Sequence, residues 1–456
     1  MTQTVPVPIW LLVLILLFAA VTFASHFLFP SVRWFFRHRL QRAVDRLNKR
    51  LTRPIEPFKL ARRTDMIQRL IYDPEVTHAI VEYAQEENVR EDVAFEKARR
   101  YAREIVPSFS AFAYFGFGIR MARGLANALY KVRTGKQNEA VISGISKDAT
   151  VVFIMNHRSN MDYVLVTYLA ARASALSYAV GEWARIWPLS RLIKSMGAYF
   201  IRRKSRGALY RKVLARYVQM ATEGGVTQAI FPEGGLSLDG RLAPPKMGLL
   251  AYVVSAGRAI ERDVVFVPVA INYDRVLEDR VLVAAHARGD RRFGARISVV
   301  VGFILRKLWL RLRGRFLRFG SAGVVFGEPL SLHDFGAEGS MDELAENLMV
   351  RIESCMPQMA VPRLLHHLLN TYRDVTQDEL LSTVSAAIAA SPDRFLVDDN
   401  EAPEDVANAG FQQLLQRHFV FLDGDIVRIN VDERPLLEFY ANSVSHSVKV
   451  NSAIAK

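Results

Sequence analysis

Cysteine is almost absent from this chain. Its 456 residues include one cysteine, Cys355, so neither a disulfide framework nor a zinc site built from several cysteines can form within it. Internal repeats and low-complexity tracts are also missing. Half of the residues are hydrophobic and 23% are charged, which excludes the disordered and collagen-like classes. The length corresponds to about three domains with full hydrophobic cores.

Charge is absent from the first 32 residues, and Arg33 is the first charged side chain. From Val5 to Ala24 the chain is apolar apart from Thr22, which is about the 20 residues that a bilayer-spanning helix needs. A cleaved signal peptide would begin with a basic segment, and none is present. We therefore expect a transmembrane anchor at 1–30. The excess of Lys and Arg after it predicts a single pass in the inner, cytoplasmic membrane, with the rest of the chain on the cytoplasmic side.

Acidic residues are nearly missing from two basic stretches. Residues 31–53 hold eight cations and one acid, and residues 303–318 hold six cations and no acid. Together they carry +13 of the formal net charge of +14. Both have an apolar stripe at helical spacing, which is typical of helices that bind anionic lipid headgroups. For 303–318 an ordinary surface helix is the alternative. A nucleic-acid partner is not expected, because no nucleic-acid-binding motif accompanies the charge.

The pattern of the chain changes near residue 140. Residues 31–139 are predicted to be a membrane-associated helical region, in which the aromatic patch 109–118 is either a bundle core or a second membrane contact. Residues 140–335 alternate apolar runs with helical stretches, which predicts an α/β domain whose site lies at strand ends. The strand candidates are 151–155, 229–231, 264–269, 297–301 and 324–326, and the helical stretches lie near 162–173, 186–195, 206–223 and 246–261.

Residues 336–456 are predicted to form a small C-terminal helical domain. It is helical from about 340 to 392. The later segment FVFLDGDIVRIN reads as a β-hairpin that turns at Asp423-Gly424.

His157 and Asp162 are the candidate catalytic pair. They follow the first strand of the α/β domain, five residues apart. A carboxylate at that spacing can hold one imidazole nitrogen and leave the other free to accept a proton from a hydroxyl. His418 and Asp423 have the same spacing, but the hairpin explains both, so the spacing needs support from other residues.

Three further blocks supply that support. Gly197–Lys204 ends in three cations, which can grip a phosphate. Phe231–Ser237 has paired glycines that let a ligand approach the backbone, with polar side chains on either side. Lys246 precedes an apolar helix, a favourable position for binding an anion. A strand then runs into the polar turn of Val267–Glu278.

These blocks, in this order, resemble the glycerolipid (HX4D) acyltransferase superfamily, and more narrowly its glycerol-3-phosphate acyltransferase branch. The narrower resemblance rests on Arg-Ser-x-Met-Asp-Tyr in the first block, GAYFIRR, VPVAINYDRVLE and the near C-terminal LLEFYANSVSH. It implies an α/β acyltransferase domain with a mixed sheet flanked by helices. It also implies that His157 is the general base and that Asp162 orients it.

The resemblance further implies the substrate-binding residues. Glycerol 3-phosphate would be held by Arg202, Arg203, Glu233, Gly234 and Ser237, with Lys246 nearby, and Pro268 would shape the acyl-donor pocket. One position departs from the family pattern, because Leu236 stands where an Arg is usual between the second Gly and the Ser. That phosphate contact is then either missing or supplied by another residue, such as Arg241 or Lys246.

The implied reaction moves an acyl chain from acyl-CoA or acyl-carrier protein to the sn-1 hydroxyl of glycerol 3-phosphate, the first step of phospholipid synthesis. No metal and no organic cofactor is expected, since His157 has neither a second His at i+4 nor a nearby Cys. Two alternatives stay open, a lysophosphatidate acyltransferase and a catalytically silent membrane scaffold. Acyl-chain length and the type of donor are not readable from these residues.

Overall fold

The computed structural model describes residues 8–170, 174–181, 189–202, 207–289, 318–336, 339–371 and 373–445. The chain divides into two compact units, Met1–Pro54 and Ile55–Lys456. The first unit contains the long helix α1 (Ile9–Asn48), whose side chains at 20, 21, 23–38 and 40 are outside the described set. Within the described residues, no helix combines the length and the apolar character that crossing a bilayer requires.

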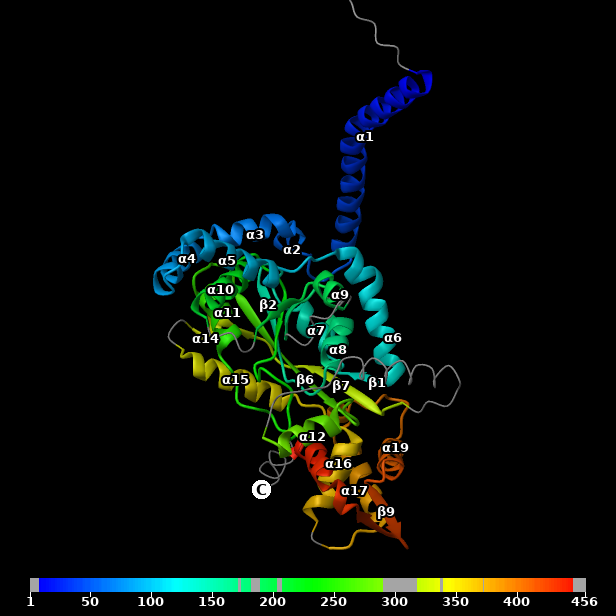
Figure 1. Cartoon of the computed structure of the whole chain (residues 1–456). Helices are drawn as coiled ribbons and strands as arrows, with labels where there is room; N and C mark the ends of the chain where they lie inside the picture. Colours follow the sequence, from blue (N-terminus) through cyan, green and yellow to red (C-terminus); the bar gives the residue numbers. More distant parts are fainter. Residues whose placement is uncertain are drawn as a thin grey trace, which may run out of the picture. The chain divides into compact units, whose positions relative to one another are not determined.

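A mixed β-sheet forms the centre of the second unit (Figure 1). Its strands run in the order β1-β7-β6-β2-β5-β3-β4, and β8 pairs with β6. Neighbours from β6 through β2, β5 and β3 to β4 are parallel, whereas β7 and β8 are antiparallel to β6. The strands are β1 (Lys131–Thr134), β2 (Thr150–Met155), β3 (Ser177–Gly181), β4 (Tyr199–Ile201), β5 (Gln228–Ile230), β6 (Val264–Tyr273), β7 (Ser321–Phe326) and β8 (Leu330–Ser331).

Helices cover both faces of this sheet, which is why β2 and β6 are buried along their whole length and mostly apolar rather than alternating. Odd-numbered side chains of β2, such as Phe153, pack in one core with helices α6, α8 and the C-terminal helices. Even-numbered ones, such as Ile154, pack in a second core with α3–α5, α10, α11 and α15. The helices before and within the α/β region are α2 (Pro57–Leu60), α3 (Arg63–Ile71), α4 (Pro74–Glu86), α5 (Glu91–Ile105), α6 (Ile119–Leu129), α7 (Asn138–Ser143), α8 (Met161–Leu169), α9 (Leu189–Ser195), α10 (Ala208–Glu223), α11 (Gly248–Arg258), α12 (Asp279–Ala287) and α14 (Leu332–Phe335).

The aromatic patch 109–118 forms a π-helix, η1 (Phe112–Gly118), that continues into α6. Tyr114 is fully buried, and its hydroxyl accepts a hydrogen bond from the Leu176 backbone N–H. Phe112 and Phe117 are exposed. The patch therefore contributes to the core through Tyr114 and presents aromatic rings at the surface as well.

The C-terminal part of the chain is mainly helical. The expected hairpin is confirmed as β9 (Val420–Asp423) and β10 (Ile426–Ile429), but its two-residue loop is Gly424-Asp425, one residue later than expected. Gly424 has a φ of +60°, a conformation that glycine adopts without steric cost. The helices are α15 (Met341–Ser354), α16 (Ala360–Asn370), α17 (Gln377–Ala390), α18 (Pro392–Phe395), α19 (Pro403–Gln416), η4 (Val431–Glu433) and α20 (Arg434–Asn442).

Four of the five expected strands are confirmed, as β2, β5, β6 and β7. The fifth, 297–301, and most of the basic stretch 303–318 lie outside the described residues. Four strands were not expected: β1, β3, β4 and β8. They are two to five residues long, too short for a clear apolar period.

Candidate active site

The candidate site lies just beyond the carboxyl end of β2, at the edge where the parallel strands β5, β3 and β4 also end. Asn156 fixes the exit of the chain from the sheet. Its side-chain amide donates to the Ile271 carbonyl at 2.9 Å and its oxygen accepts from the Ile271 N–H at 2.8 Å. This pair of bonds continues the β2–β6 ladder by one residue, so that His157 leaves the sheet in a defined direction.

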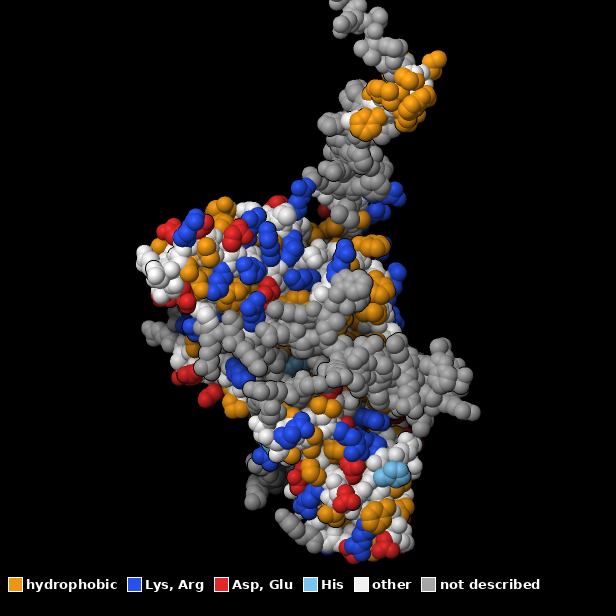
Figure 2. Space-filling model, viewed as in Figure 1, with side chains coloured by type: hydrophobic (Ala, Val, Ile, Leu, Met, Phe, Trp, Pro, Cys, Tyr) orange, Lys and Arg blue, Asp and Glu red, His pale blue; other side chains and the backbone are white. Residues whose placement is uncertain are grey.

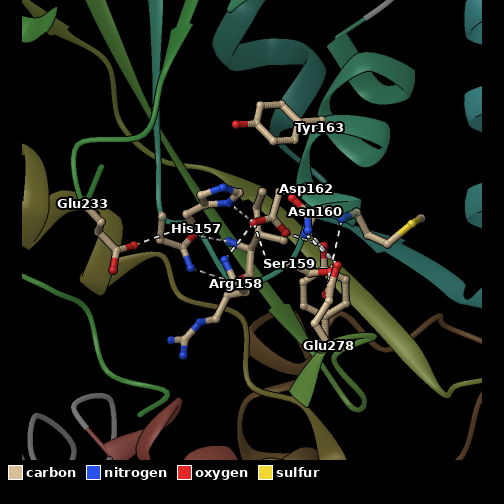
Figure 3. A network of polar contacts seen from close by, with 12 residues as sticks. His157, Arg158, Ser159, Asn160, Asp162, Tyr163, Glu233 and Glu278 are labelled. Carbon is tan, nitrogen blue, oxygen red and sulfur yellow. Dashed lines mark hydrogen bonds and ion pairs between the residues drawn. The ribbon is translucent and has the colours of Figure 1, made fainter. Parts of the chain in front are cut away.

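His157 and Asp162 form a buried pair, as the sequence predicts (Figure 3). The His157 Nδ1 lies 2.9 Å from Asp162 Oδ2. The same oxygen accepts the backbone N–H groups of Arg158 at 2.7 Å and Ser159 at 3.0 Å. A carboxylate accepts rather than donates, so in the neutral imidazole the proton is on Nδ1 and the lone pair is on Nε2. Among the described residues, Nε2 makes no hydrogen bond.

Aromatic rings enclose the imidazole. Phe231 stacks on it with centroids 4.1 Å apart, and Tyr163 meets it edge-on at 5.4 Å. The His157 side chain is only 3% exposed. The apolar walls exclude water and hold the ring in one plane, which suits a base that acts on a bound substrate.

The Phe231–Ser237 block binds the backbone of His157 from both sides. Glu233 Oε1 accepts the His157 N–H at 2.8 Å, and the Ser237 N–H donates to the His157 carbonyl at 2.9 Å. Glu233 Oε2 accepts the Ala243 N–H at 2.9 Å. The Ser237 hydroxyl donates to the Arg241 carbonyl. Burial raises the pKa of Glu233. In this structure Glu233 and Ser237 hold the backbone of His157 in place.

Tyr273 and Glu278 also bind the segment from His157 to Asp162, and neither is assigned a role from the sequence. The Tyr273 hydroxyl donates to Asp162 Oδ1, so that both oxygens of Asp162 are used. Glu278 Oε2 accepts from the Ser159 hydroxyl at 2.7 Å, and its Oε1 accepts from the Asn160 side chain at 3.0 Å. Both residues belong to the VPVAINYDRVLE block. A single sequence does not reveal that residues 110 or more positions away contact this loop.

Arg158 is a third residue that the sequence did not single out. Its side chain is 2% exposed, and its Nη1 donates to the Gly240 carbonyl. Burial lowers the pKa of its guanidinium. Leu236, at the position where the family usually has Arg, is partly buried against the first core. An apolar contact therefore occupies that position here.

The Lys246 side chain runs beside Gly234, in the turn of the Phe231–Ser237 block. The expected helix is confirmed, since α11 begins two residues after it, at Gly248. Gly234 has a φ of +65°, and a Cβ at that position would lie 2.8 Å from the Lys246 Cδ. Glycine suits this position for two reasons. It adopts the positive φ without steric cost, and it leaves room for the Lys246 side chain where a Cβ would stand.

The structure does not bring Arg202 close to the pair formed by His157 and Asp162. Its guanidinium makes two bonds to Glu104, at 2.9 and 2.7 Å, and faces the rings of Tyr101 and Tyr210. It follows β4, three strand spacings from β2, or roughly 14 Å across the sheet. Arg203 lies outside the described residues.

Pro268 is also apart from the dyad. It is buried within β6, in register with Ile154. By the alternation of the strand, its ring faces the second core, and it lies beside Gly327.

The C-terminal segment 436–445 packs against the loops of the site. The Tyr440 hydroxyl accepts the Val276 N–H at 3.0 Å and donates to Asp279 at 2.6 Å. Asn442 donates to the Asp239 carbonyl at 2.9 Å. These bonds tie the turn that carries Glu278 to a helix more than 150 residues away in the chain.

An acyltransferase family model matches residues 136–272, and a model of the glycerol-3-phosphate acyltransferase C-terminal region matches residues 309–456. The first range holds the dyad, and the second holds the segment that packs on its loops. Over these two ranges the chain is similar to the acyltransferases and to the C-terminal region of the glycerol-3-phosphate acyltransferases.

Relatives named glycerol-3-phosphate acyltransferase match most of the chain. That of Aeromonas hydrophila is 28% identical over 87% of this chain and 51% of its own length, and that of Pseudoalteromonas translucida is 27% identical with the same shares. That of Shewanella loihica is 32% identical over 64% of this chain and 35% of its own length. The chain thus spans about half the length, or less, of these curated relatives.

A solved structure, the 1-acyl-sn-glycerophosphate (LPA) acyltransferase PlsC from Thermotoga maritima, matches 64% of this chain and 95% of that one. The identity is 19% and the TM-score is 0.33. At that TM-score the likeness supports no argument about this chain. Among the described residues, no group of three or more His, Cys, Asp or Glu side chains is placed to bind a metal ion.

Proposed function

We propose that this chain transfers an acyl group from a thioester donor, acyl-CoA or acyl-carrier protein, to the sn-1 hydroxyl of glycerol 3-phosphate. The observation that carries the proposal is the His157–Asp162 pair at the end of β2, whose Nε2 makes no hydrogen bond within the described part of the chain. The names of the relatives support the choice of acceptor.

His157 acts as the general base. Its Nε2 removes the proton from the acceptor hydroxyl while that oxygen attacks the carbonyl carbon of the thioester. Asp162 stabilises the imidazolium that forms. The tetrahedral oxyanion then collapses and breaks the C–S bond, and the imidazolium returns the proton to the departing thiolate. The ester and the free thiol are the products, and no covalent intermediate on the protein is required.

The oxyanion needs a donor from the protein. The backbone N–H of Gly235 makes no hydrogen bond among the described residues and lies in the turn between Glu233 and Ser237, which bind the His157 backbone. We assign the oxyanion to this group. A pre-oriented N–H stabilises developing charge without reorganisation during the reaction.

The acceptor phosphate is assigned to Lys246, Arg203 and, in place of the usual family Arg, Arg241. Lys246 and Arg241 are exposed beside the glycine turn. Arg202 would reach the acceptor only by exchanging its bonds with Glu104 for bonds to the phosphate. Such cations orient a dianionic acceptor so that its hydroxyl faces Nε2.

We place the enzyme at the cytoplasmic face of the inner membrane, at the first step of phospholipid synthesis. The apolar run Val5–Ala24 is proposed as a single-pass anchor on the basis of its sequence. The basic stretches 31–53 and 303–318 are proposed to bind anionic lipids. The proposed domains are the anchor 1–30, a membrane-associated helical region 31–139, the catalytic domain 140–335 and the C-terminal domain 336–456.

Replacing each histidine of the two equally spaced pairs by asparagine tests the assignment. His157→Asn should lower kcat by at least about 100-fold, since general-base catalysis contributes about 10²–10⁴-fold. His418→Asn should leave kcat unchanged, and asparagine tolerates the positive φ of 55° at that position. Near wild-type turnover in His157→Asn would exclude His157 as the base.

Lysophosphatidate is the second candidate acceptor, because it carries the same phosphate monoester as glycerol 3-phosphate and the cations assigned to the acceptor would bind either one. The purified protein should be offered glycerol 3-phosphate and lysophosphatidate separately with one acyl-CoA. Consumption of glycerol 3-phosphate supports the first assignment. Consumption of lysophosphatidate alone would replace it with the second.

A further inference from the structure

A cationic pocket lies beside the edge strand β4, away from the dyad. It has a volume of about 420 Å³ and is lined by Arg63, Glu104, Ser190, Arg191, Lys194 and Phe200, among others. It combines residues of α3, α5 and α9 with the edge strand. Figure 2 shows Lys and Arg side chains gathered over α3 and α5, with fewer acidic ones between them.

The charges of this pocket do not cancel. Glu104 is the acidic residue of the lining, and its carboxylate already binds the Arg202 guanidinium through two bonds. Arg63, Arg191 and Lys194 therefore leave a net charge of about +3 at the cavity. The Arg63 pKa is lowered by burial and by the nearby charge of Arg103, as expected where cations crowd without an anion.

Two of these cations also have a structural role. Arg63 and Lys194 both donate to the Arg103 carbonyl near the carboxyl end of α5, where positive charge stabilises a helix. Arg191 differs, because it is exposed and makes no hydrogen bond or ion pair among the described residues. Together with the two other cations of the lining, this side chain without a partner in the described part of the chain is the feature from which we infer an anionic ligand.

The position of the pocket selects the ligand. Glu104 lines it and binds Arg202, which directly follows β4, so the pocket lies at least three strands, or roughly 14 Å, from the strand that leads to His157. Glycerol 3-phosphate has five bonds of about 1.5 Å between its reacting oxygen and phosphorus, and it spans only roughly 6 Å. Coenzyme A has more than about 20 bonds between sulfur and its 3′-phosphate, and its extended reach is roughly 20 Å or more.

We propose that this pocket binds the 3′-phosphate and diphosphate end of the coenzyme A donor, with Arg191 and Lys194 as the principal contacts. This inference rests on the proposed acyl transfer and adds that the donor is acyl-CoA rather than a carrier protein. Arginine binds a phosphate through two parallel bonds, and lysine adds a point charge. The phosphopantetheine of a carrier protein has no 3′-phosphate and would gain little from this pocket.

Binding should be measured by titration calorimetry on the full chain with three probes, namely coenzyme A, dephospho-coenzyme A and adenosine 3′,5′-bisphosphate. Coenzyme A and the bisphosphate should bind the wild type, and dephospho-coenzyme A should bind about tenfold or more weakly. Arg191→Glu should weaken coenzyme A by about 10- to 100-fold. Arg100→Glu is the matched control, since Arg100 is exposed on α5 outside the pocket lining. This variant should bind coenzyme A with the affinity of the wild type.

Turnover and lipid binding complete the test. Arg191→Glu should raise the KM for acyl-CoA about tenfold or more and leave unchanged the KM for glycerol 3-phosphate and the rate with an acyl-pantetheine thioester. A raised KM for glycerol 3-phosphate would overturn the proposal in favour of an acceptor site. Loss of binding to phosphatidylglycerol vesicles with unchanged coenzyme A affinity would overturn it in favour of a lipid headgroup. If calorimetry succeeds but no acyl transfer occurs, the proposed function fails and the nucleotide site stands.

Discussion

Glu233→Gln separates two roles for the carboxylate that the sequence assigns to the acceptor. In the structure each of its oxygens accepts one backbone N–H, from His157 and from Ala243. Glutamine has one oxygen and one NH₂ group, so in either orientation one of these buried N–H groups faces another donor. An unpaired buried donor costs about 1–3 kcal/mol, and the free energy of unfolding should fall by that amount.

Activity should fall with a specific signature. The His157 N–H bond fixes the base, so its loss should lower kcat by about 5- to 150-fold, the rate equivalent of the same 1–3 kcal/mol. The KM for glycerol 3-phosphate should change less than about twofold, because the acceptor keeps its own contacts. Urea unfolding and steady-state kinetics on one preparation measure both quantities.

Asp274→Asn is the matched control for Glu233→Gln. Asp274 is also buried and accepts two backbone N–H groups, from Ser321 at 2.8 Å and Val361 at 3.0 Å. It should lose a similar unfolding free energy without the fall in kcat. The reasoning is refuted if Glu233→Gln leaves kcat unchanged and raises the KM for glycerol 3-phosphate, since the carboxylate would then contact the acceptor.

Three further substitutions test other contacts of the site. Tyr273→Phe removes the hydroxyl that donates to Asp162 and keeps the ring; kcat should fall about 3- to 30-fold while the KM values hold, and an unchanged kcat would show that Asp162 needs no such partner. Gly234→Ala should cost about 1–2 kcal/mol for its positive φ and raise the acceptor KM by displacing Lys246. Gly289→Ala has the same φ of +65° with no atom near its Cβ, so equal acceptor KM values in the two variants would contradict the lysine contact. Glu278→Gln tests the pH dependence: burial raises the pKa of Glu278 above its ordinary value of 4.5, so its ionisation in the folded state opposes folding as pH rises through that raised pKa. Urea unfolding from about pH 5 to about pH 8 should show the wild type losing stability relative to Glu278→Gln as pH rises, and a parallel pair of curves would refute the assignment.

Local pattern in the sequence is enough to predict the dyad but not its support. His157 and Asp162 are five residues apart at the end of one strand, so a single turn is enough to bring them together. Tyr273 and Glu278 reach the same loop only because β6 lies beside β2 in the sheet. Strand order is a property of the whole fold, and no periodicity in a single chain encodes it.

The same distinction explains the strands. β2 and β6 are long, wholly buried apolar runs, which composition reveals. β3 and β4 contain Ser, Tyr and Gly and are held by their neighbours in the sheet rather than by their own propensity. The partner of Arg202 was equally hidden, because Glu104 belongs to a helix nearly a hundred residues earlier whose docking against β4 only the fold defines.

Release of free thiol from acyl-CoA by the purified chain, with and without glycerol 3-phosphate, tests the central claim most directly. We predict that release depends on the acceptor, yields 1-acylglycerol 3-phosphate in equal amount and is lost in His157→Asn while His418→Asn retains it. Release that is independent of the acceptor, or that persists in His157→Asn, would contradict acyl transfer by this histidine.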